Sequence, residues 1–220
     1  FDKVIMQAGG IGYGLTNQAI KDTPAKGDKI IVLGGDNYRI GIGGAAVSSA
    51  DTGAFSKGIE LNAVQRSNPE MQKRVANAIR GMVESNNNSI VSIHDHGAGG
   101  HLNCLSELVE EVGGEINLDM LPVGDPTLSD KEIIGNESQE RMGLIIDSND
   151  LNLLNKIAER ERAPIYDVGT ITDDKRFTIK SKSKGNTPLD LSLDNFFGSS
   201  PLTVMNDNKK IINYSSIFYD

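Results

Sequence analysis

The run Lys29–Leu33 constrains the fold of this chain more than any other feature. Four β-branched or apolar residues follow Lys29, turn-forming residues 24–28 precede the run, and Gly34 and Gly35 close it. A short apolar run rich in Ile and Val and closed by glycine is typical of a buried strand. We therefore predict a strand that runs directly into a glycine loop.

Two amphipathic helices are predicted further along the chain. Asn68 can cap the first, and Pro69 suits its first helical position. Its apolar residues share one face: Met71, Val75, Ile79, Met82 and Val83. The second helix follows a loop at 94–100, and its inward residues are Leu102, Leu105, Leu108, Val109 and Val112.

The remaining pattern adds strands to these helices. Strands are predicted at 89–93, 115–121 and 141–147, a helix at 151–160, and a strand pair within 166–180 that turns at Asp173 and Asp174. Helices mixed with strands, some of them adjacent in sequence, favour an α+β fold, a layered domain with a mixed sheet. We expect this domain at 27–180, with connectors to neighbouring domains at 1–26 and 181–220.

Composition excludes several classes of protein. The 220 residues carry a formal net charge of −8, whereas nucleic-acid surfaces need clustered Lys and Arg. Cys104 is the single cysteine, so no internal disulfide forms. Every apolar run is far shorter than the ~18 residues of a membrane span. We expect a cytoplasmic protein that binds neither nucleic acid nor membrane.

The first candidate site is the glycine-rich segment 34–49. Successive backbone N–H groups around Gly43 and Gly44 can cradle phosphate oxygens at a helix start, and Ser48 and Ser49 add hydroxyl donors. A glycine turn that only permits tight packing explains the pattern equally well. A Walker loop is excluded, because no Gly-Lys-Ser/Thr occurs.

The second candidate contains all three histidines, where a strand ends and a helix begins: His94, His96 and His101. Residues at i and i+2 on an extended segment point to opposite faces, which argues against zinc. We favour Asp95 as an oxygen ligand of Mg²⁺, which takes one or two carboxylates and completes its shell with phosphate and water. The alternative for Asp95 is a carboxylate that caps a helix or braces the loop.

The third candidate is the polar cluster before the strand at 141–147. Glu137, Ser138 and Gln139 offer hydrogen bonds to ribose hydroxyls, an amide or a phosphate, although polar runs before strands are often solvated turns. Gln65 lies near a helix start, where a surface amide is the simpler interpretation.

Taken in order, five segments resemble the large, single-chain form of formylglycinamide ribonucleotide amidotransferase: 34–49, 64–71, 94–100, 136–141 and 161–164. In that family, the synthetase region has two halves, each similar to aminoimidazole ribonucleotide synthetase. This chain resembles the C-terminal subdomain of the first half. The resemblance implies that Gln65, Glu137, Ser138 and Gln139 contact formylglycinamide ribonucleotide, that the loop from Gly41 to Ser49 faces its phosphate, and that Asp95 binds Mg²⁺.

The resemblance also implies a reaction. ATP activates the substrate amide oxygen as an iminophosphate. Ammonia, which a separate glutaminase domain releases from glutamine, then displaces the phosphate. The family's catalytic histidine and glutaminase triad lie outside these residues, and Cys104, on a predicted apolar helix, is not that nucleophile. Whether Asp95 serves the catalytic or an auxiliary nucleotide site stays open. The alternatives are another ATP-using member of the superfamily, such as a selenophosphate or thiamine-phosphate enzyme, or a non-catalytic interaction domain.

Overall fold

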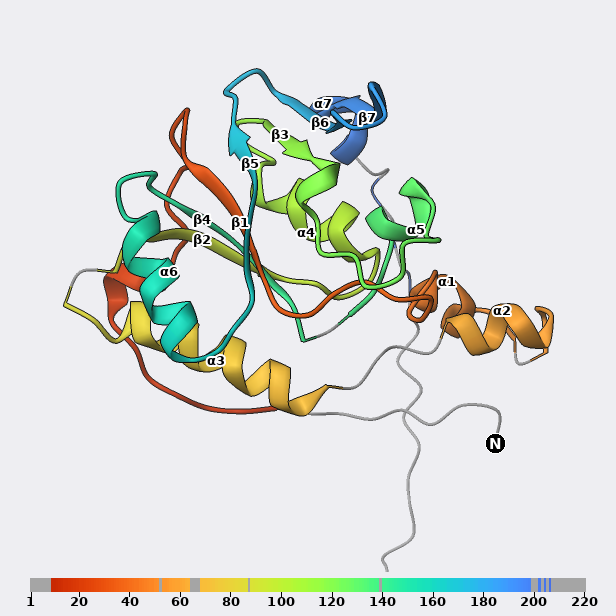
Figure 1. Ribbon diagram of the computed structural model, residues 1–220, viewed down its shortest axis with the longest axis horizontal. Coiled ribbons are helices and arrows are strands. Elements are labelled where there is room, and N and C mark those ends of the chain that lie inside the picture. Colours follow the sequence, from red (N-terminus) through yellow and green to blue (C-terminus); the bar gives the residue numbers. More distant parts are fainter. Residues whose placement is uncertain are drawn as a thin grey trace, which may run out of the picture.

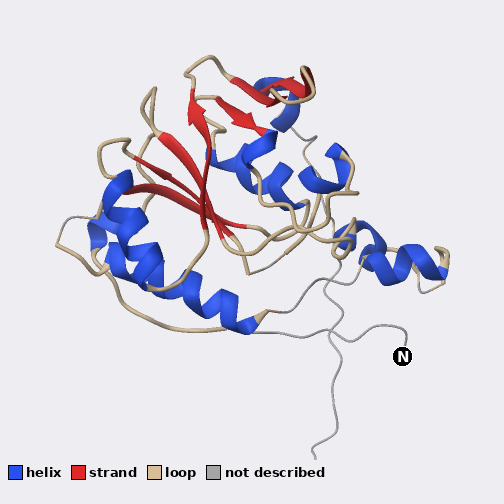
Figure 2. Cartoon of the chain, viewed as in Figure 1, coloured by secondary structure: helices blue, strands red, loops and turns tan. Residues whose placement is uncertain are grey.

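A mixed seven-stranded sheet forms the centre of the molecule (Figures 1 and 2). The computed structural model describes residues 9–51, 53–63, 68–86, 88–138 and 140–198, and the single positions 202, 204 and 206. The strands are β1 (Lys29–Leu33), β2 (Ile90–Asp95), β3 (Gly114–Asn117), β4 (Met142–Ile146), β5 (Ile165–Ile171), β6 (Arg176–Ser181) and β7 (Asn186–Ser192). Their order is β2-β4-β1-β5-β3-β6-β7, and only β3 and β6 pair in parallel.

Strand β1 is buried on both faces. Ile30 and Val32 join one apolar cluster, whereas Ile31 and Leu33 join a second. This division follows from the alternation of side chains along a strand. The predicted strand is therefore confirmed, and it separates two cores.

Each core is covered by helices on its own side of the sheet (Figure 1). Helices α3 (Pro69–Val83) and α6 (Leu151–Arg160) cover one face and pack together through residues such as Met82 and Leu154. Helix α4 (Gly100–Leu108) covers the other face, where Leu105 and Leu108 are buried. The arrangement is a layered α+β domain, as predicted.

The boundaries of α3 and α6 follow the sequence signals. The Asn68 side chain accepts a hydrogen bond from the Met71 N–H at 3.0 Å, and Pro69 occupies the first turn. Helix α6 spans the predicted residues. Six shorter helices complete the described part: η1 (Thr16–Gln18), α1 (Gly44–Ser49), α2 (Lys57–Asn62), η2 (Leu118–Met120), α5 (Asp130–Ile134) and α7 (Leu193–Phe197).

Three predictions about elements were wrong. The strand expected at 115–121 ends at Asn117, because its side chain accepts from the Asp119 N–H and caps η2. The strands within 166–180 are not neighbours, because β3 lies between β5 and β6. Residues 186–197, expected in a connector, form β7, which pairs with β6, and α7, which packs on β7.

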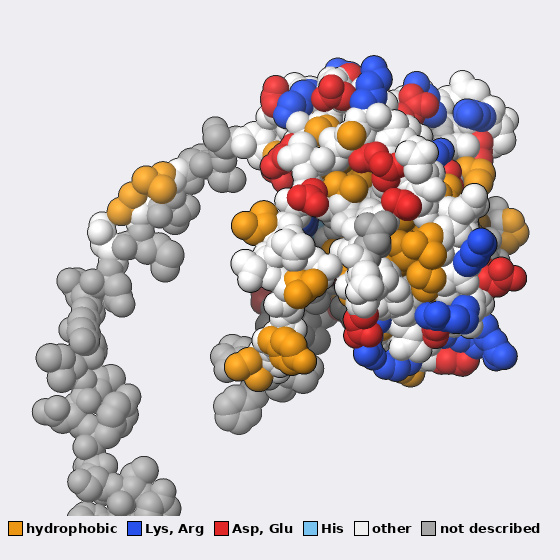
Figure 3. Space-filling view, turned by 90° about the vertical axis from the view of Figure 1, so that its left-hand side faces the viewer, with side chains coloured by type: hydrophobic (Ala, Val, Ile, Leu, Met, Phe, Trp, Pro, Cys, Tyr) orange, Lys and Arg blue, Asp and Glu red, His pale blue; other side chains and the backbone are white. Residues whose placement is uncertain are grey.

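The surface is mixed in charge. Acidic and basic side chains are interspersed over the face in Figure 3. In the described part of the chain, no helix is long and apolar enough to cross a membrane.

Candidate functional site

Three of the predicted segments meet at one end of the sheet. Strand β4 pairs antiparallel with both β1 and β2, and Met142 lies opposite Leu33 on one side and Asp95 on the other. The loop that follows β1, the loop that follows β2 and the segment that precedes β4 therefore leave the sheet together. Strand pairing thus brings together residues that lie far apart in the sequence, such as Leu33, Asp95 and Met142.

Glu137 joins the two glycine-containing segments. Its carboxylate accepts from the Ala45 N–H at 3.1 Å, near the start of α1, and from the Gly99 N–H at 3.1 Å, just before α4. A carboxylate stabilises a helix N-terminus because it pairs with exposed N–H groups and with the positive end of the helix dipole. Glu137, with 2% of its surface exposed, is therefore a shared cap for two helices.

Two glycines allow these loops to approach the 136–137 backbone. Gly41 has φ +71°, and a Cβ there would lie 2.2 Å from the Glu137 carbonyl oxygen. Gly100 has φ +60°, and a Cβ there would lie 2.3 Å from the Asn136 carbonyl oxygen. Any side chain at either position would separate the loops from that backbone.

The predicted phosphate loop folds as the start of a short helix. Gly43 is the N-cap of α1 with φ +66°, and Gly44 is buried in its first turn. The hydroxyls of Ser48 and Ser49 donate to the Ala45 carbonyl, at 3.1 and 2.8 Å. The backbone geometry suits an anion, while Ala45 N–H donates to Glu137.

Arg141 lies beneath the three segments with its side chain fully buried. The guanidinium donates to Asn37 Oδ1, to His101 Nε2 at 2.9 Å and to the carbonyl oxygen and Oδ1 of Asn136 at 2.6 and 2.9 Å. It thus contacts the loop after β1, helix α4 and the segment before β4.

Arg141 also sets the hydrogen bonding of two buried histidines. Because a guanidinium only donates, His101 Nε2 must accept the hydrogen bond from Arg141. In the neutral ring the proton is then on His101 Nδ1, which donates to His96 Nε2 at 2.9 Å. The pKa values of both rings are well below the usual range, first because burial disfavours the charged form and second because Arg141 repels it. Both are neutral, and His96 Nδ1 carries a proton in a buried position where no described residue accepts it.

The third histidine lies apart from this pair. His94 Nδ1 donates to the Asp95 carbonyl at 2.8 Å, and its Nε2 contacts the Glu107 carboxylate. Within the described residues, no three His, Cys, Asp or Glu side chains converge to hold a metal. The histidine pair is committed to hydrogen bonds beside a cation, which is an unsuitable environment for zinc.

Asp95 ends β2 with its side chain exposed. Its carboxylate is a hard oxygen donor at the same end of the sheet as the glycine loops, so its chemistry fits Mg²⁺ that is bound chiefly by phosphate and water. Gln65 and Gln139 lie outside the described residues. Ser138 is 1% exposed, and its hydroxyl donates to Asn136 Oδ1 at 2.9 Å.

Sequence reasoning missed Asn37 and the roles of Asn136, His101 and Arg141. The available signal was Arg141 itself, a charged residue directly before the apolar strand β4. A cation at such a boundary is buried only where several acceptors surround it.

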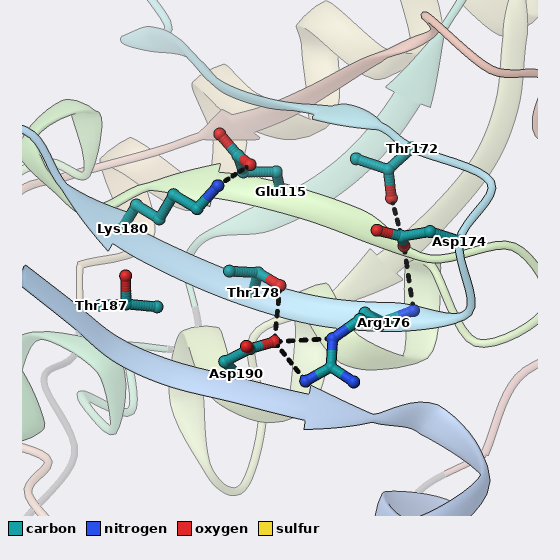
Figure 4. Close-up of a pocket in the computed structure, with 8 residues that line it drawn as sticks. All are labelled: Glu115, Thr172, Asp174, Arg176, Thr178, Lys180, Thr187 and Asp190. Atoms are coloured by element: carbon teal, nitrogen blue, oxygen red, sulfur yellow. Dashed lines mark hydrogen bonds and ion pairs between the residues drawn. The ribbon is translucent and has the colours of Figure 1, made fainter.

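A hollow elsewhere on the surface has a different character (Figure 4). It lies over β3, β6 and β7, where Lys180 contacts Glu115 and Arg176 donates to Asp190 at 2.7 and 2.9 Å. Cross-strand pairs of opposite charge stabilise a solvated sheet face. We therefore assign these residues to the stability of the sheet.

The fold and site define a known class of domain. Residues 25–182 match the family model described as AIR synthase related protein, C-terminal domain. Because the match covers more than half of the chain, the chain belongs to this family.

The relatives are more specific than the family. The chain is 41% identical over 203 residues to phosphoribosylformylglycinamidine synthase of Schizosaccharomyces pombe, covering 91% of this chain and 15% of that protein. It is 38% identical over 216 residues to the Homo sapiens protein of the same name, covering 90% of this chain and 16% of that protein. The resemblance to this enzyme is confirmed, and the chain spans about 15% of the length of such relatives.

Solved structures share the fold. The structure described as T. maritima PurL complexed with FGAR has a TM-score of 0.77 and 24% identity, covering 88% of this chain and 31% of that one. T. maritima PurL complexed with ATP has a TM-score of 0.67 and 20% identity, covering 91% of this chain and 31% of that one.

Proposed function

We propose that this chain is part of an ATP- and glutamine-dependent ligase that converts formylglycinamide ribonucleotide to formylglycinamidine ribonucleotide in purine biosynthesis. The relatives' names support the reaction, and the ligands named for the similar structures support both substrates. The observation that carries the proposal is Glu137, whose carboxylate joins the glycine loop to the loop after Asp95.

The 136–139 segment is proposed to contact formylglycinamide ribonucleotide, together with Gln65. Asn136, Glu137 and Ser138 are themselves buried, so their side chains hold the segment in place for the substrate. The substrate phosphate lies at the glycine loop, where Gly43 and Gly44 let the backbone come close to it.

Asp95 is proposed to hold Mg²⁺, which neutralises phosphate charge during phosphoryl transfer when it is bound. The exposed carboxylate at the end of β2 supports this role. A single carboxylate matches the way Mg²⁺ combines one or two protein ligands with phosphate oxygens.

The other domains that the reaction requires are proposed to belong to the parent protein. The family domain at 27–180 is extended by β7 and α7, and 1–26 and the residues after Phe197 connect to neighbouring domains. Apolar side chains exposed near α2 support packing against those domains, since Phe55, Ile59 and Leu61 are 39%, 48% and 61% exposed. Glutamine acts at a separate glutaminase domain, and we place the enzyme in the cytoplasm.

Complementation tests this function. The full-length parent carrying Asp95→Asn, Glu137→Gln or Ser138→Ala is expressed in a purine-auxotrophic strain. The control is Glu159→Gln, which removes one carboxylate charge from an exposed position of α6. We expect the control to grow without purines and the site variants to grow poorly while remaining soluble. Normal growth of all three site variants would show that these residues do not serve the ligase.

A further inference from the structure

We propose that Arg141 is a positioning residue of the substrate site. Its buried guanidinium holds the loop after β1, the start of α4 and the 136–138 segment in the single arrangement that the substrate meets. This inference rests on the proposed function, because it assumes that the 136–138 segment adjoins the substrate. It assigns Arg141 no contact with the substrate.

The guanidinium fits its acceptors as a fork. One terminal nitrogen donates to Asn37 Oδ1 and to His101 Nε2, and the other donates to both the backbone and the side-chain oxygen of Asn136. A planar fork fixes direction as well as distance, which a lysine ammonium cannot do. Arg141 therefore sets the relative orientation of three chain segments.

Asn136 connects Arg141 to two further segments. Its side-chain nitrogen donates to the Tyr38 and Ile40 carbonyls, at 2.9 and 2.7 Å, which holds the loop before Gly41. Its Oδ1 accepts from Ser138 Oγ at 2.9 Å as well as from Arg141. The guanidinium is thus linked to the Ser138 hydroxyl and to the glycine loop through a single residue, Asn136.

The arginine stem is confined as tightly as its head. Gly34 has φ +127°, and a Cβ there would lie 2.6 Å from Arg141 Cγ. The glycine that ends β1 therefore leaves space for the stem. Because the aliphatic stem and the guanidinium are both held in place, Arg141 fixes the position of the loops that it contacts.

The site needs such a device because its loops lie outside the apolar cores. Asn37, Asn136 and Ser138 are buried polar residues that hydrogen-bond to Arg141 or to one another. Hydrogen bonds to a charged group are stronger and more directional than those between neutral groups. The network replaces hydrophobic packing where a substrate must reach the backbone.

Substrate kinetics of the full-length parent enzyme test the inference. Arg141→Lys keeps the charge and loses the fork. We expect kcat/KM for formylglycinamide ribonucleotide to fall by about 100-fold, since small misplacements of positioned groups have effects of that order. The change is expected mainly in KM for that substrate, while KM for glutamine stays within twofold.

A core variant separates positioning from general destabilisation. Phe177→Leu creates space in the apolar cluster at β6, at a side chain that cannot take part in the hydrogen-bond network. If both variants lower the melting temperature but only Arg141→Lys raises KM for formylglycinamide ribonucleotide, the positioning role stands. If Arg141→Lys changes KM no more than Phe177→Leu does, the inference is wrong.

Three further variants keep the test decisive if Arg141→Lys does not fold. Asn37→Ala removes one acceptor and should raise KM, whereas His101→Gln, which can accept from Arg141 and donate to His96, should restore most of the activity that His101→Leu loses. Equal activity of His101→Gln and His101→Leu, with wild-type KM in Asn37→Ala, overturns the inference.

The outcome is distinguishable from failure of the proposed function. If Ser138→Ala and Asp95→Asn have wild-type kinetics while Arg141→Lys raises KM, the proposed residue roles fail and the positioning role holds. If Ser138→Ala raises KM while Arg141→Lys matches Phe177→Leu, the proposed function holds and the Arg141 inference is wrong.

Discussion

Individual glycines in this protein differ in what they permit. Gly185 has φ +64°, and no heavy atom lies within 4 Å of a Cβ built there. Gly100 has nearly the same φ, but a Cβ would meet the Asn136 backbone. The first glycine relieves only local strain, while the second also allows two segments of the site to touch.

These two glycines provide a matched comparison. Gly185→Ala should lower the free energy of unfolding by about 1–2 kcal/mol, the cost of a left-handed alanine. Gly100→Ala should cost clearly more, because the Asn136 backbone must also move. Chemical denaturation of the two variants checks this, and equal losses would contradict the close approach at Gly100.

At the scale of elements, helix caps distinguish α3 from α2. Asn68 accepts a hydrogen bond from the Met71 N–H, whereas the N-cap of α2, Ser56, makes no side-chain cap. Asn68→Ala should therefore destabilise the chain by about 1 kcal/mol. Ser56→Ala should leave the denaturation midpoint almost unchanged, and a loss equal to that of Asn68→Ala would argue against the capping bond.

A second element-scale device joins η2 to the turn between β6 and β7. Asp119 accepts from the Ser183 N–H at 2.8 Å and from the hydroxyls of Ser181 and Ser183. These bonds, led by that backbone N–H, lower the pKa of Asp119 from 3.8 to about 2.

The lowered pKa of Asp119 makes the stability of the fold depend on pH. The folded state binds the Asp119 proton more weakly than the unfolded state, so the stabilisation is present above pH 3.8 and is lost as pH falls toward 2. Asp119→Asn should flatten this acid limb in thermal denaturation measured from pH 5 to 2. An unchanged limb would show that other carboxylates produce it.

At the scale of the whole molecule, Cys104 reports on the integrity of the fold. The thiol is 1% exposed, and burial raises its pKa well above the usual range. Thiol reagents should therefore label it only at the rate of unfolding, whereas an exposed thiol in Ser48→Cys should react at once. Rapid labelling of the native wild type would show that α4 opens locally.

The isolated chain should not catalyse the ligase reaction if, as the resemblance implies, the family's catalytic histidine lies outside these residues. The check is an assay of the purified 220-residue chain with formylglycinamide ribonucleotide, ATP and ammonia. Turnover would contradict the proposed division of the site among domains. Addition of the full parent to the same assay is the positive control.

Local sequence determined the elements that have a strong apolar pattern or a clear capping signal. Strand β1, the capped start of α3 and the full extent of α6 were all predicted, because apolar periodicity and capping act over a few residues. Segments 34–49, 94–100 and 136–141 were predicted as candidates for the site, because their residue types were conspicuous and resembled those of one enzyme family.

Only the tertiary structure decided how these segments combine. The insertion of β3 between β5 and β6, the addition of β7, and the pairing of β4 with both β1 and β2 depend on contacts between residues far apart in the sequence. The joint cap made by Glu137 and the fork of Arg141 arise from that pairing. A buried carboxylate or guanidinium is stable only where distant segments supply its partners, and local sequence does not encode which segments those are.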